Sequence, residues 1–231
     1  MKYLFYLVIL LFFTSCSVFK PSKSGHSSTN FVKIETDSGT IVVRLSDKTP
    51  LTTANFLKLV KQHFYDGLLF HRVIPGFMIQ GGDPDSKNAP AGKVLGEGGL
   101  GYTVPAEFDT TLFHQKGAIA MARENDDVNP KKASSSTQFY LVEGRTFTDV
   151  EMNQIEDKFK IKIPESHREI YRTVGGAPFL DMNYTVFGQT VKGLDVIDKI
   201  AHVQRDKNDR PVHDIHMKIS VMKKKDYRRY R

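Results

Sequence analysis

The sequence predicts a single, mainly β domain with few helices and one inserted helical pair. Its apolar residues fall mostly in short runs, many of them alternating with polar residues, which is typical of strands. Helical spacing is confined to a few segments. At 231 residues, with 40% hydrophobic and 26% charged residues, the chain is long enough to bury a sizeable core and has an ordinary globular composition.

The first predicted elements are a hairpin and a helix. Residues 31–45 alternate apolar and polar positions around the turn sequence Asp37-Ser38-Gly39, which predicts two paired strands. Pro50 and Thr52 then open a helix, because proline is favoured in the first helical turn. The apolar positions with helical spacing in this segment are Phe56, Leu59, Val60 and Phe64.

A second predicted hairpin, at residues 70–84, carries a charge among apolar residues. Its sequence, FHRVIPGFMIQGGDP, is that of two short strands joined by a turn at Pro75-Gly76. Side chains alternate between the two faces of a strand, so Arg72 lies on a face that can meet Met78 and Gln80 across the hairpin. The pattern predicts a cation beside an apolar wall.

Short strands dominate the rest of the predicted domain, which covers residues 31–222. No internal repeat is visible in the chain. The strand-like segments are residues 117–122, 137–142, 184–190 and 212–222, and residues 191–201 have the spacing of a second helix.

An insertion at about residues 145–178 predicts the helical pair. Residues 148–151 form a capping box that starts one helix, and Pro164 opens another, which glycines at 175 and 176 end. The insertion has two interpretations: a packed decoration, or a device that shapes which extended polypeptides enter a nearby site. The expected apolar faces are Met152, Ile155 and Phe159 on the first helix, and Ile163, His167, Ile170 and Val174 on the second.

The hairpin at residues 70–84 closely resembles the signature of the cyclophilin family of peptidyl-prolyl cis/trans isomerases. Further motifs recur in the family's order, so the resemblance covers residues 31–222. It implies a closed, eight-stranded antiparallel barrel capped by two helices, a closure that leaves no exposed sheet edge. These further motifs are residues 117–122 (GAIAMA), 137–141 (TQFYL), 179–181 (FLD) and 184–188 (YTVFG).

The resemblance also implies the residues of a proline-binding site. Arg72 and Gln80 are the expected catalytic residues, and Gln80 and Gln138 bind the substrate backbone or orient Arg72. The chain departs from well-known eukaryotic relatives, which carry Phe, Trp, His and Asn at positions 140, 179, 184 and 123. The expected substrate-binding set is Phe77, Met78, Met121, Ala122, Arg123, Gln138, Tyr140, Phe179, Leu180 and Tyr184.

The implied reaction is rotation of the peptide bond before proline. This bond has a barrier of about 18–20 kcal/mol, because amide resonance is lost when it twists. A fixed cation near the prolyl nitrogen and an apolar wall both favour the twisted state, and Arg72, Phe77 and Met78 supply them. No atom is transferred, so no cofactor and no metal are expected. The expected partners are proline-containing polypeptides.

Two other motifs are disfavoured on their context. Residues 96–101 (GEGGLG) match the dinucleotide-binding fingerprint. In that motif the glycines are followed by a helix whose N-terminus binds the phosphate, but here residues 102–105 (YTVP) follow and do not predict a helix. His71, His114 and Asp83 could belong to the active site of a hydrolase. However, no serine or cysteine lies in the turn motif that presents a nucleophile, and the H-x-x-x-H spacing of a metal site does not occur.

The N-terminus predicts a lipoprotein signal at residues 1–15, with lipidation of Cys16. After one lysine, residues 3–13 form an apolar stretch of 11 residues, too short to span a bilayer, which needs about 20. Residues 16–30 predict a flexible tether with a reach of roughly 20 Å. The pattern resembles bacterial lipoproteins, and Ser17 resembles those sent to the outer membrane, so we expect a membrane-anchored, periplasm-facing protein.

The net charge of +7 is uneven, and residues 223–231 hold +5 of it. Nucleic-acid binding is disfavoured, because these basic residues are not interleaved with aromatic residues on a folded face. We expect a solvated tail, or one attracted to anionic lipid. The sequence carries no prediction of oligomeric state. The alternative function is a non-catalytic module that holds proline segments or acts as an envelope scaffold; the intact Arg72 favours catalysis.

Overall fold

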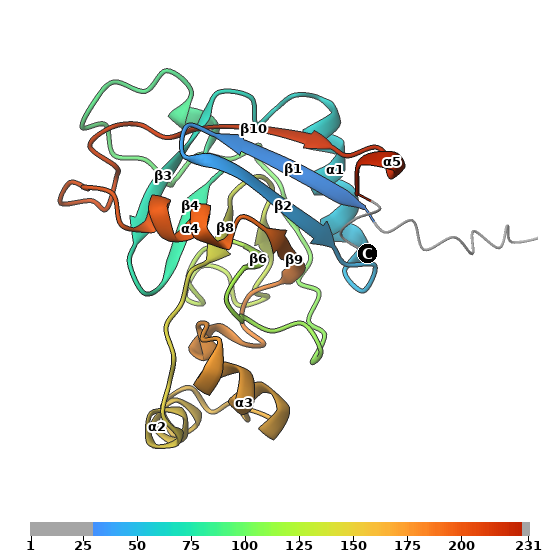
Figure 1. Cartoon of the computed structure of the whole chain (residues 1–231), viewed down its shortest axis with the longest axis vertical. Helices are drawn as coiled ribbons and strands as arrows, with labels where there is room; N and C mark the ends of the chain where they lie inside the picture. The colour runs from blue at the N-terminus through green and yellow to red at the C-terminus, as the bar shows by residue number, and fades with distance from the viewer. Residues whose placement is uncertain (1–29, 228–231) are drawn as a thin grey trace, which may run out of the picture.

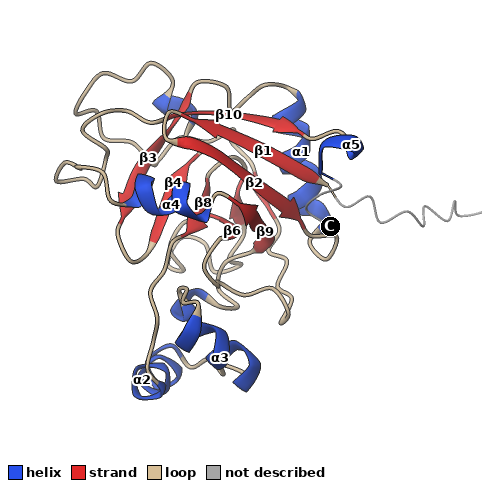
Figure 2. Ribbon diagram, viewed as in Figure 1, coloured by secondary structure: helices blue, strands red, loops and turns tan. Residues whose placement is uncertain are grey.

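The computed structural model describes residues 30–227 and shows a closed β-barrel (Figure 1, Figure 2). Its strand order is β1-β10-β3-β4-β8-β6-β9-β2, and β1 pairs with both β10 and β2, which completes the ring. The predicted mainly β fold with eight-stranded closure is confirmed. The strands are β1 (Phe31–Thr36), β2 (Gly39–Leu45), β3 (Leu68–Ile74), β4 (Met78–Gly81), β6 (Ala118–Met121), β8 (Phe139–Val142), β9 (Val186–Lys192) and β10 (His216–Val221).

Two helices complete the barrel core. Helix α1 (Pro50–Lys61) begins with proline in its first turn, as predicted, and α4 (Leu194–Ala201) follows β9. Both bury one face in the barrel interior, with Phe56, Leu59 and Val60 on α1 and Val196, Ile197 and Ile200 on α4. The other short elements are β5 (Thr103–Val104), β7 (Ser134–Ser135), and the 3-10 turns η1 (Pro84–Ser86) and η2 (Pro178–Leu180).

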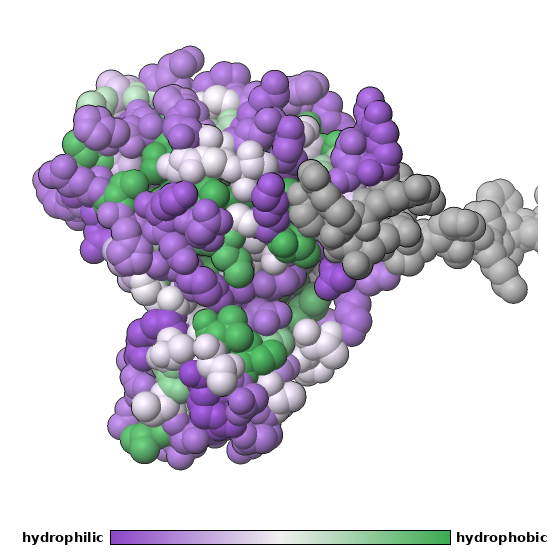
Figure 3. All heavy atoms as spheres, viewed as in Figure 1, coloured by the Kyte–Doolittle hydropathy of each residue, from purple (hydrophilic) through white to green (hydrophobic). Residues whose placement is uncertain are grey.

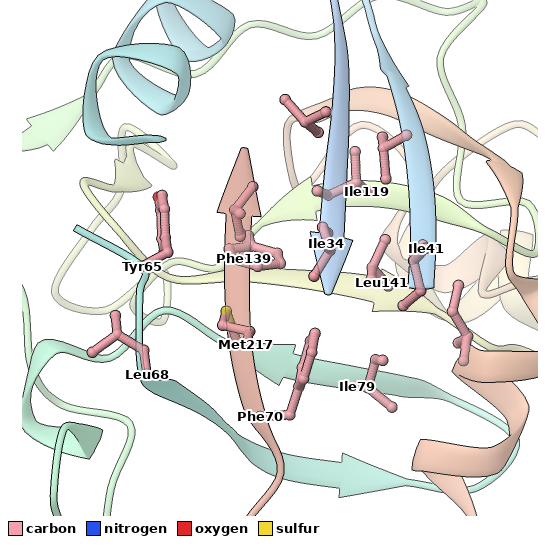
Figure 4. Packing of buried hydrophobic residues seen from close by; sticks show 14 of the residues in the cluster. Ile34, Ile41, Tyr65, Leu68, Phe70, Ile79, Ile119, Phe139, Leu141 and Met217 are labelled. Atoms are coloured by element: carbon pink, nitrogen blue, oxygen red, sulfur yellow. The ribbon is translucent and has the colours of Figure 1, made fainter. Parts of the chain in front are cut away.

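The inward-facing residues of the strands fill the barrel, as Figure 4 shows for Ile34, Ile79, Leu141 and their neighbours. Phe139 is the centre of an aromatic group, with its ring centroid 5.5 Å from that of Phe56 and 5.6 Å from that of Tyr65. Burying one such side chain contributes about 1.5–3 kcal/mol. The filled interior makes the barrel a rigid support for whatever its outer surface carries.

Several predicted boundaries are wrong by a few residues. The helix expected from residue 191 begins at Leu194, because β9 continues through Lys192 and Gly193 then adopts a left-handed conformation with φ 91°. The last strand, expected from residue 212, begins at His216. The segments expected at 117–122, 137–142 and 184–190 are strands at 118–121, 139–142 and 186–192.

The helical insertion is present as a lobe beside the barrel, formed by α2 (Asp149–Phe159) and α3 (Glu165–Thr173) (Figure 1). The capping box is complete: Thr148 Oγ1 accepts from the Glu151 N–H at 3.3 Å, and Glu151 Oε2 accepts from the Thr148 N–H at 2.8 Å. The lobe has its own small core, made of Phe113, Phe147, Met152, Ile163 and Tyr171.

The predicted apolar face of α3 is partly wrong. Ile163 and Ile170 pack in the lobe core and His167 stacks on Phe113, as expected. Val174, however, is 49% exposed, and α3 also buries Arg168 and Tyr171. Arg168 can be buried because its Nη2 donates to Asn153 Oδ1 at 2.7 Å and to Glu156 Oε2 at 2.8 Å. A buried charge of this kind breaks the apolar spacing from which the face was predicted.

Acid is expected to loosen this lobe before the barrel. The Thr148 N–H, followed by the Arg145 guanidinium, lowers the pKa of Glu151 from 4.5 to about 2. Because the pKa is lower in the folded state, the stabilisation is complete above pH 4.5 and is lost as the pH falls toward 2. Amide NMR signals of α2 should therefore weaken before those of the barrel strands. In Glu151→Gln the signals of α2 should no longer weaken before those of the barrel. If α2 loses its signals at the same pH in the parent and in Glu151→Gln, the prediction is contradicted.

The last described residues pack on the barrel. They form the short helix α5 (Lys224–Tyr227), where the Tyr227 ring stacks on Phe31 with centroids 4.5 Å apart. Within the expected solvated tail, Lys223, Lys225 and Asp226 are exposed, whereas Tyr227 is buried because its ring finds an apolar partner. No helix within residues 30–227 is long and apolar enough to cross a membrane. The predicted signal, the lipidation site, the tether up to residue 29 and the tail beyond Tyr227 lie outside the described residues.

Candidate active site

Neighbouring strands build an apolar surface on the outside of the barrel. Alternate residues of β4, β8 and β6, such as Ile79, Leu141 and Ile119, belong to the interior core. Because side chains alternate along a strand, the residues between them face outward. Together with Ala177, Leu180 of η2 and Val186 of β9, they form a second buried cluster, here called the outer cluster. Its members on β4, β6 and β8 are Met78, Ala118, Ala120, Tyr140 and Val142.

Strand register lines up one row of side chains across the outer face. Arg72 of β3 pairs with Gln80 of β4, and Gln80 pairs with Tyr140 of β8. Tyr140 pairs with Ala120 of β6, which pairs with Val186 of β9. The row therefore runs from a charged edge to an apolar centre, as the alternation in the 70–84 hairpin predicted.

A chain of side-chain hydrogen bonds fixes the position of Arg72. Arg72 Nη1 donates to Gln80 Oε1 at 3.2 Å, and Gln80 Nε2 donates to Gln138 Oε1 at 3.0 Å. Gln138 Nε2 donates to the carbonyl oxygens of Gly96 and Gly98, both at 2.8 Å. Since both N–H donors of Gln138 are used, it serves to orient Gln80, and through it Arg72. This geometry favours the orienting role over substrate binding for Gln138.

The glycine loop at residues 96–101 supports this chain and does not have the form of a phosphate cradle. Its carbonyl groups hold Gln138, and the N–H of Gly96 donates to Asp83 Oδ2. A Cβ at Gly98 would collide with the Asp83 carboxylate, so only glycine fits at that position. The loop sequence is thus explained by close packing of backbone against Asp83.

Aromatic rings border the outer cluster. Phe77 lies in the β3–β4 turn and Phe179 in η2, and their ring centroids are 5.5 Å apart. Tyr184, in the loop before β9, has its centroid 6.0 Å from that of Tyr140, nearly edge to face. The Arg123 guanidinium lies over Tyr184, 4.6 Å from the ring centroid. Phe77, Phe179 and Tyr184 are all only partly buried, so a ligand on the outer cluster can reach them.

A buried hydrogen-bond chain joins the outer cluster to the inserted helices. His114 Nδ1 is 2.9 Å from Asp181 Oδ1, and His114 Nε2 is 2.9 Å from the Tyr140 hydroxyl. On the other side, the Tyr171 hydroxyl of α3 donates to Asp181 Oδ2 at 2.7 Å. Because a carboxylate only accepts, Nδ1 carries a proton, and in the neutral ring Nε2 then accepts from the Tyr140 hydroxyl. Asp181 directly follows η2, so this chain anchors η2 from both sides.

Burial shifts the pKa values of two tyrosines and one histidine near the site toward their uncharged forms. It raises the pKa of Tyr140 and of Tyr171 above the ordinary 10, so both remain hydroxyl donors. It lowers the pKa of His71 to about 4, so this imidazole is neutral at pH 7. His114 bonds Asp181 and not Asp83, so the imagined hydrolytic set is not assembled. Within residues 30–227, no group of three or more His, Cys, Asp or Glu side chains could hold a metal ion.

The structure brings most of the predicted site residues together, with one correction. Met121 is fully buried in the barrel interior with Phe139, so it does not line the site. Its side chain points inward because Ala120 and Ala122, on either side of it, point outward. The residues found in the outer cluster or packed against it are Phe77, Met78, Ala122, Tyr140, Phe179, Leu180 and Tyr184, with Arg72, Gln80 and Gln138 at the edge and Arg123 beside Tyr184.

His114, Asp181 and Tyr171 are site residues that the sequence did not predict. One signal was present: a tyrosine at position 140 places a hydroxyl on an apolar surface, where it needs a hydrogen-bond partner. The sequence could not name that partner, because His114 and Asp181 are 67 residues apart.

A closed eight-stranded barrel with an arginine held beside an apolar surface is the arrangement that the sequence resemblance implies. The family model of the cyclophilin type peptidyl-prolyl cis-trans isomerases matches residues 31–222, and the chain belongs to this family. It is therefore a peptidyl-prolyl cis-trans isomerase, as its sequence resemblance predicted.

Relatives agree with this assignment. Predicted peptidyl-prolyl cis-trans isomerases of Staphylococcus haemolyticus and Staphylococcus saprophyticus are 35% and 33% identical to the chain. The matches cover 80% and 79% of this chain and 86% of each relative. A crystal structure of a cyclophilin type isomerase from Cryptosporidium parvum has the same fold, with a TM-score of 0.63 at 22% identity, over 84% of this chain and 98% of that one.

Proposed function

We propose that the X-Pro bond is turned on the outer cluster, with Arg72 directed at the prolyl nitrogen. The observation that carries this assignment is the hydrogen-bond chain from Arg72 through Gln80 to Gln138. It occupies Nη1 of Arg72 and leaves other guanidinium N–H groups for the substrate. A module that only holds proline segments needs the apolar surface but not a cation fixed beside it.

The reaction needs these two features together. When the C–N bond twists, the prolyl nitrogen regains its lone pair and the amide loses charge separation. A donor already fixed in place then binds the lone pair, and an apolar surface favours the less polar twisted state over the planar one. Arg72 supplies the donor, and the proline ring packs on Phe77, Met78, Tyr140 and Leu180.

Neither feature is sufficient alone. A hydrogen bond from a charged group contributes about 1.5–3 kcal/mol, whereas a rate acceleration of roughly 10⁵ needs about 7 kcal/mol. The apolar surface and the positioning of the substrate have to supply the rest. The test is the loss of catalysed exchange, with peptide binding retained, when Arg72 is replaced.

We further propose that the enzyme acts on proteins outside the cytoplasm, anchored to a membrane by lipid on Cys16. The apolar run at residues 3–13, the small residues before Cys16 and the polar segment after it support this proposal. With a tether reach of roughly 20 Å, the barrel stays close to the membrane surface. Its substrates are then unfolded or newly translocated chains that contain proline.

Replacing Cys16 with alanine is expected to give an unprocessed or soluble protein, because no thiol remains to carry the lipid. The check is phase partitioning in detergent, with incorporation of a labelled fatty acid in a bacterial host. Ser17→Ala is the matched control and should behave like the parent. If Cys16→Ala still partitions into the detergent phase, the proposed lipid anchor on Cys16 is wrong.

A further inference from the structure

Aromatic rings continue from the proline site onto the inserted lobe. Phe77 in the β3–β4 turn and Phe179 in η2 have their ring centroids 5.5 Å apart, with an interplanar angle of 42°. Phe159, the last residue of α2, lies 6.1 Å from Phe179 at 32°. Phe179 packs against both the outer cluster and the lobe core, so it joins the two. These three side chains are called the ring row.

The outer end of the ring row is open to solvent. Phe159 is 41% exposed, although burying a phenylalanine side chain is favourable. The chain leaves α2 at Lys160, which has a left-handed conformation with φ 55°, and so turns away after Phe159. Figure 3 shows hydrophobic residues on the lobe where it faces the barrel, amid a mostly hydrophilic surface. An apolar area continuous with a substrate site is typical of a binding surface.

The ring row is also held in place before any substrate arrives. Phe179 lies in η2, which Asp181 anchors through His114 on one side and Tyr171 on the other. Helix α2, which carries Phe159, is fixed at its start by the complete capping box and packs against η2. Because little ordering is needed on binding, contacts on such a surface contribute more of their energy to affinity.

We propose that the ring row is a substrate subsite for a large apolar side chain two or three residues from the proline. This proposal rests on the proline-binding role of the outer cluster. An extended chain advances about 3.3 Å per residue. The two centroid distances along the ring row, 5.5 Å from Phe77 at the proline to Phe179 and 6.1 Å from Phe179 to Phe159, therefore span at most about three residues. The insertion thereby selects among polypeptides that contain proline, which gives it a role beyond packing.

A lysine at the outer end of the ring row adds a preference against basic substrate side chains. Lys158 Nζ lies 5.4 Å from the centroid of the Phe159 ring. A lysine or arginine of the substrate placed on Phe159 is repelled by this ammonium group, whereas leucine or phenylalanine is not. The subsite therefore accepts large apolar side chains and disfavours basic ones.

The test is a panel of Ala-Pro peptides that carry leucine, alanine or lysine two or three residues from the proline, on either side. For the parent, we expect leucine at the favoured position to raise kcat/KM over alanine by about threefold to tenfold, and lysine to lower it. Phe159→Ala should abolish the leucine preference, and Phe159→Leu should retain most of it. Val150→Ala, at a 66% exposed position on the same helix, is the matched control and should keep the full preference.

The outcomes separate the subsite from the catalytic assignment. Turnover of the all-alanine peptide reports the isomerase activity, and the ratio of leucine to alanine peptides reports the ring row. An unchanged ratio in Phe159→Ala, with normal turnover, overturns the proposal. If the parent turns over none of the peptides, NMR titration of the same panel measures their binding. Equal affinity for the leucine and alanine peptides then overturns the proposed subsite.

Discussion

Replacing Arg72 with alanine is expected to lower kcat/KM by roughly 10² to 10³, the loss typical of one fixed transition-state donor. Peptide affinity should change much less, because the apolar surface that holds the proline ring is untouched. The fold should persist, since Arg72 is only partly buried and its bonding partner Gln80 keeps its contact with Gln138. Exchange NMR on an Ala-Pro peptide gives the rate, and chemical-shift titration gives the affinity.

The control for this experiment is an arginine on another part of the barrel. Arg44 is exposed on β2, away from the outer cluster, and Arg44→Ala should leave kcat/KM unchanged. If Arg72→Ala keeps activity within about threefold of the parent, the apolar surface alone carries the rate and the donor role is wrong.

Replacing Asp181 with alanine is expected to lower the free energy of unfolding by about 3–5 kcal/mol. Its carboxylate accepts three hydrogen bonds: from the backbone N–H of His114, from the ring Nδ1 of His114 and from the Tyr171 hydroxyl. His114 is fully buried. Each buried donor left without a partner costs about 1–3 kcal/mol. Catalysis should fall as well, because η2 loses its anchor. Urea unfolding, followed by circular dichroism, measures the loss.

An exposed aspartate provides the comparison. The Asp195 side chain is 73% exposed and pairs with Lys199 at 3.4 Å, so Asp195→Ala should change stability by less than about 0.5 kcal/mol. Tyr171→Phe removes one hydroxyl and should cost about 1 kcal/mol. An Asp181→Ala protein as stable as Asp195→Ala would show that the buried chain does not anchor η2.

Local patterns predicted the parts of the fold that local forces decide. The hairpin turn at Pro75-Gly76, the start of α1 at Pro50 and the capping box at Thr148 all depend on residues a few positions apart. The meeting of Arg72 with Gln80 is likewise set by alternation along one hairpin. These features needed no knowledge of the rest of the chain.

Features that depend on distant contacts were not predictable in the same way. Every residue of β6 is apolar and buried, so the pattern could not tell that Met121 faces the interior while Ala120 faces outward. The bond between His114 and Asp181 exists only because η2 packs beside the barrel. The start of α4 depends on how far β9 pairs with β2, which overrides the local helical spacing.

The most direct test of the proposed mechanism is Arg72→Lys, because it keeps the positive charge and changes only how that charge is held. An ammonium group lacks the planar fork that Gln80 fixes, and it is more strongly hydrated than a guanidinium beside Phe77 and Met78. Lineshape NMR on an Ala-Pro peptide should show fast cis/trans exchange with the parent and exchange nearly as slow with Arg72→Lys as with Arg72→Ala. Activity of Arg72→Lys within about threefold of the parent would contradict the account, because a charge without fixed geometry would then be sufficient.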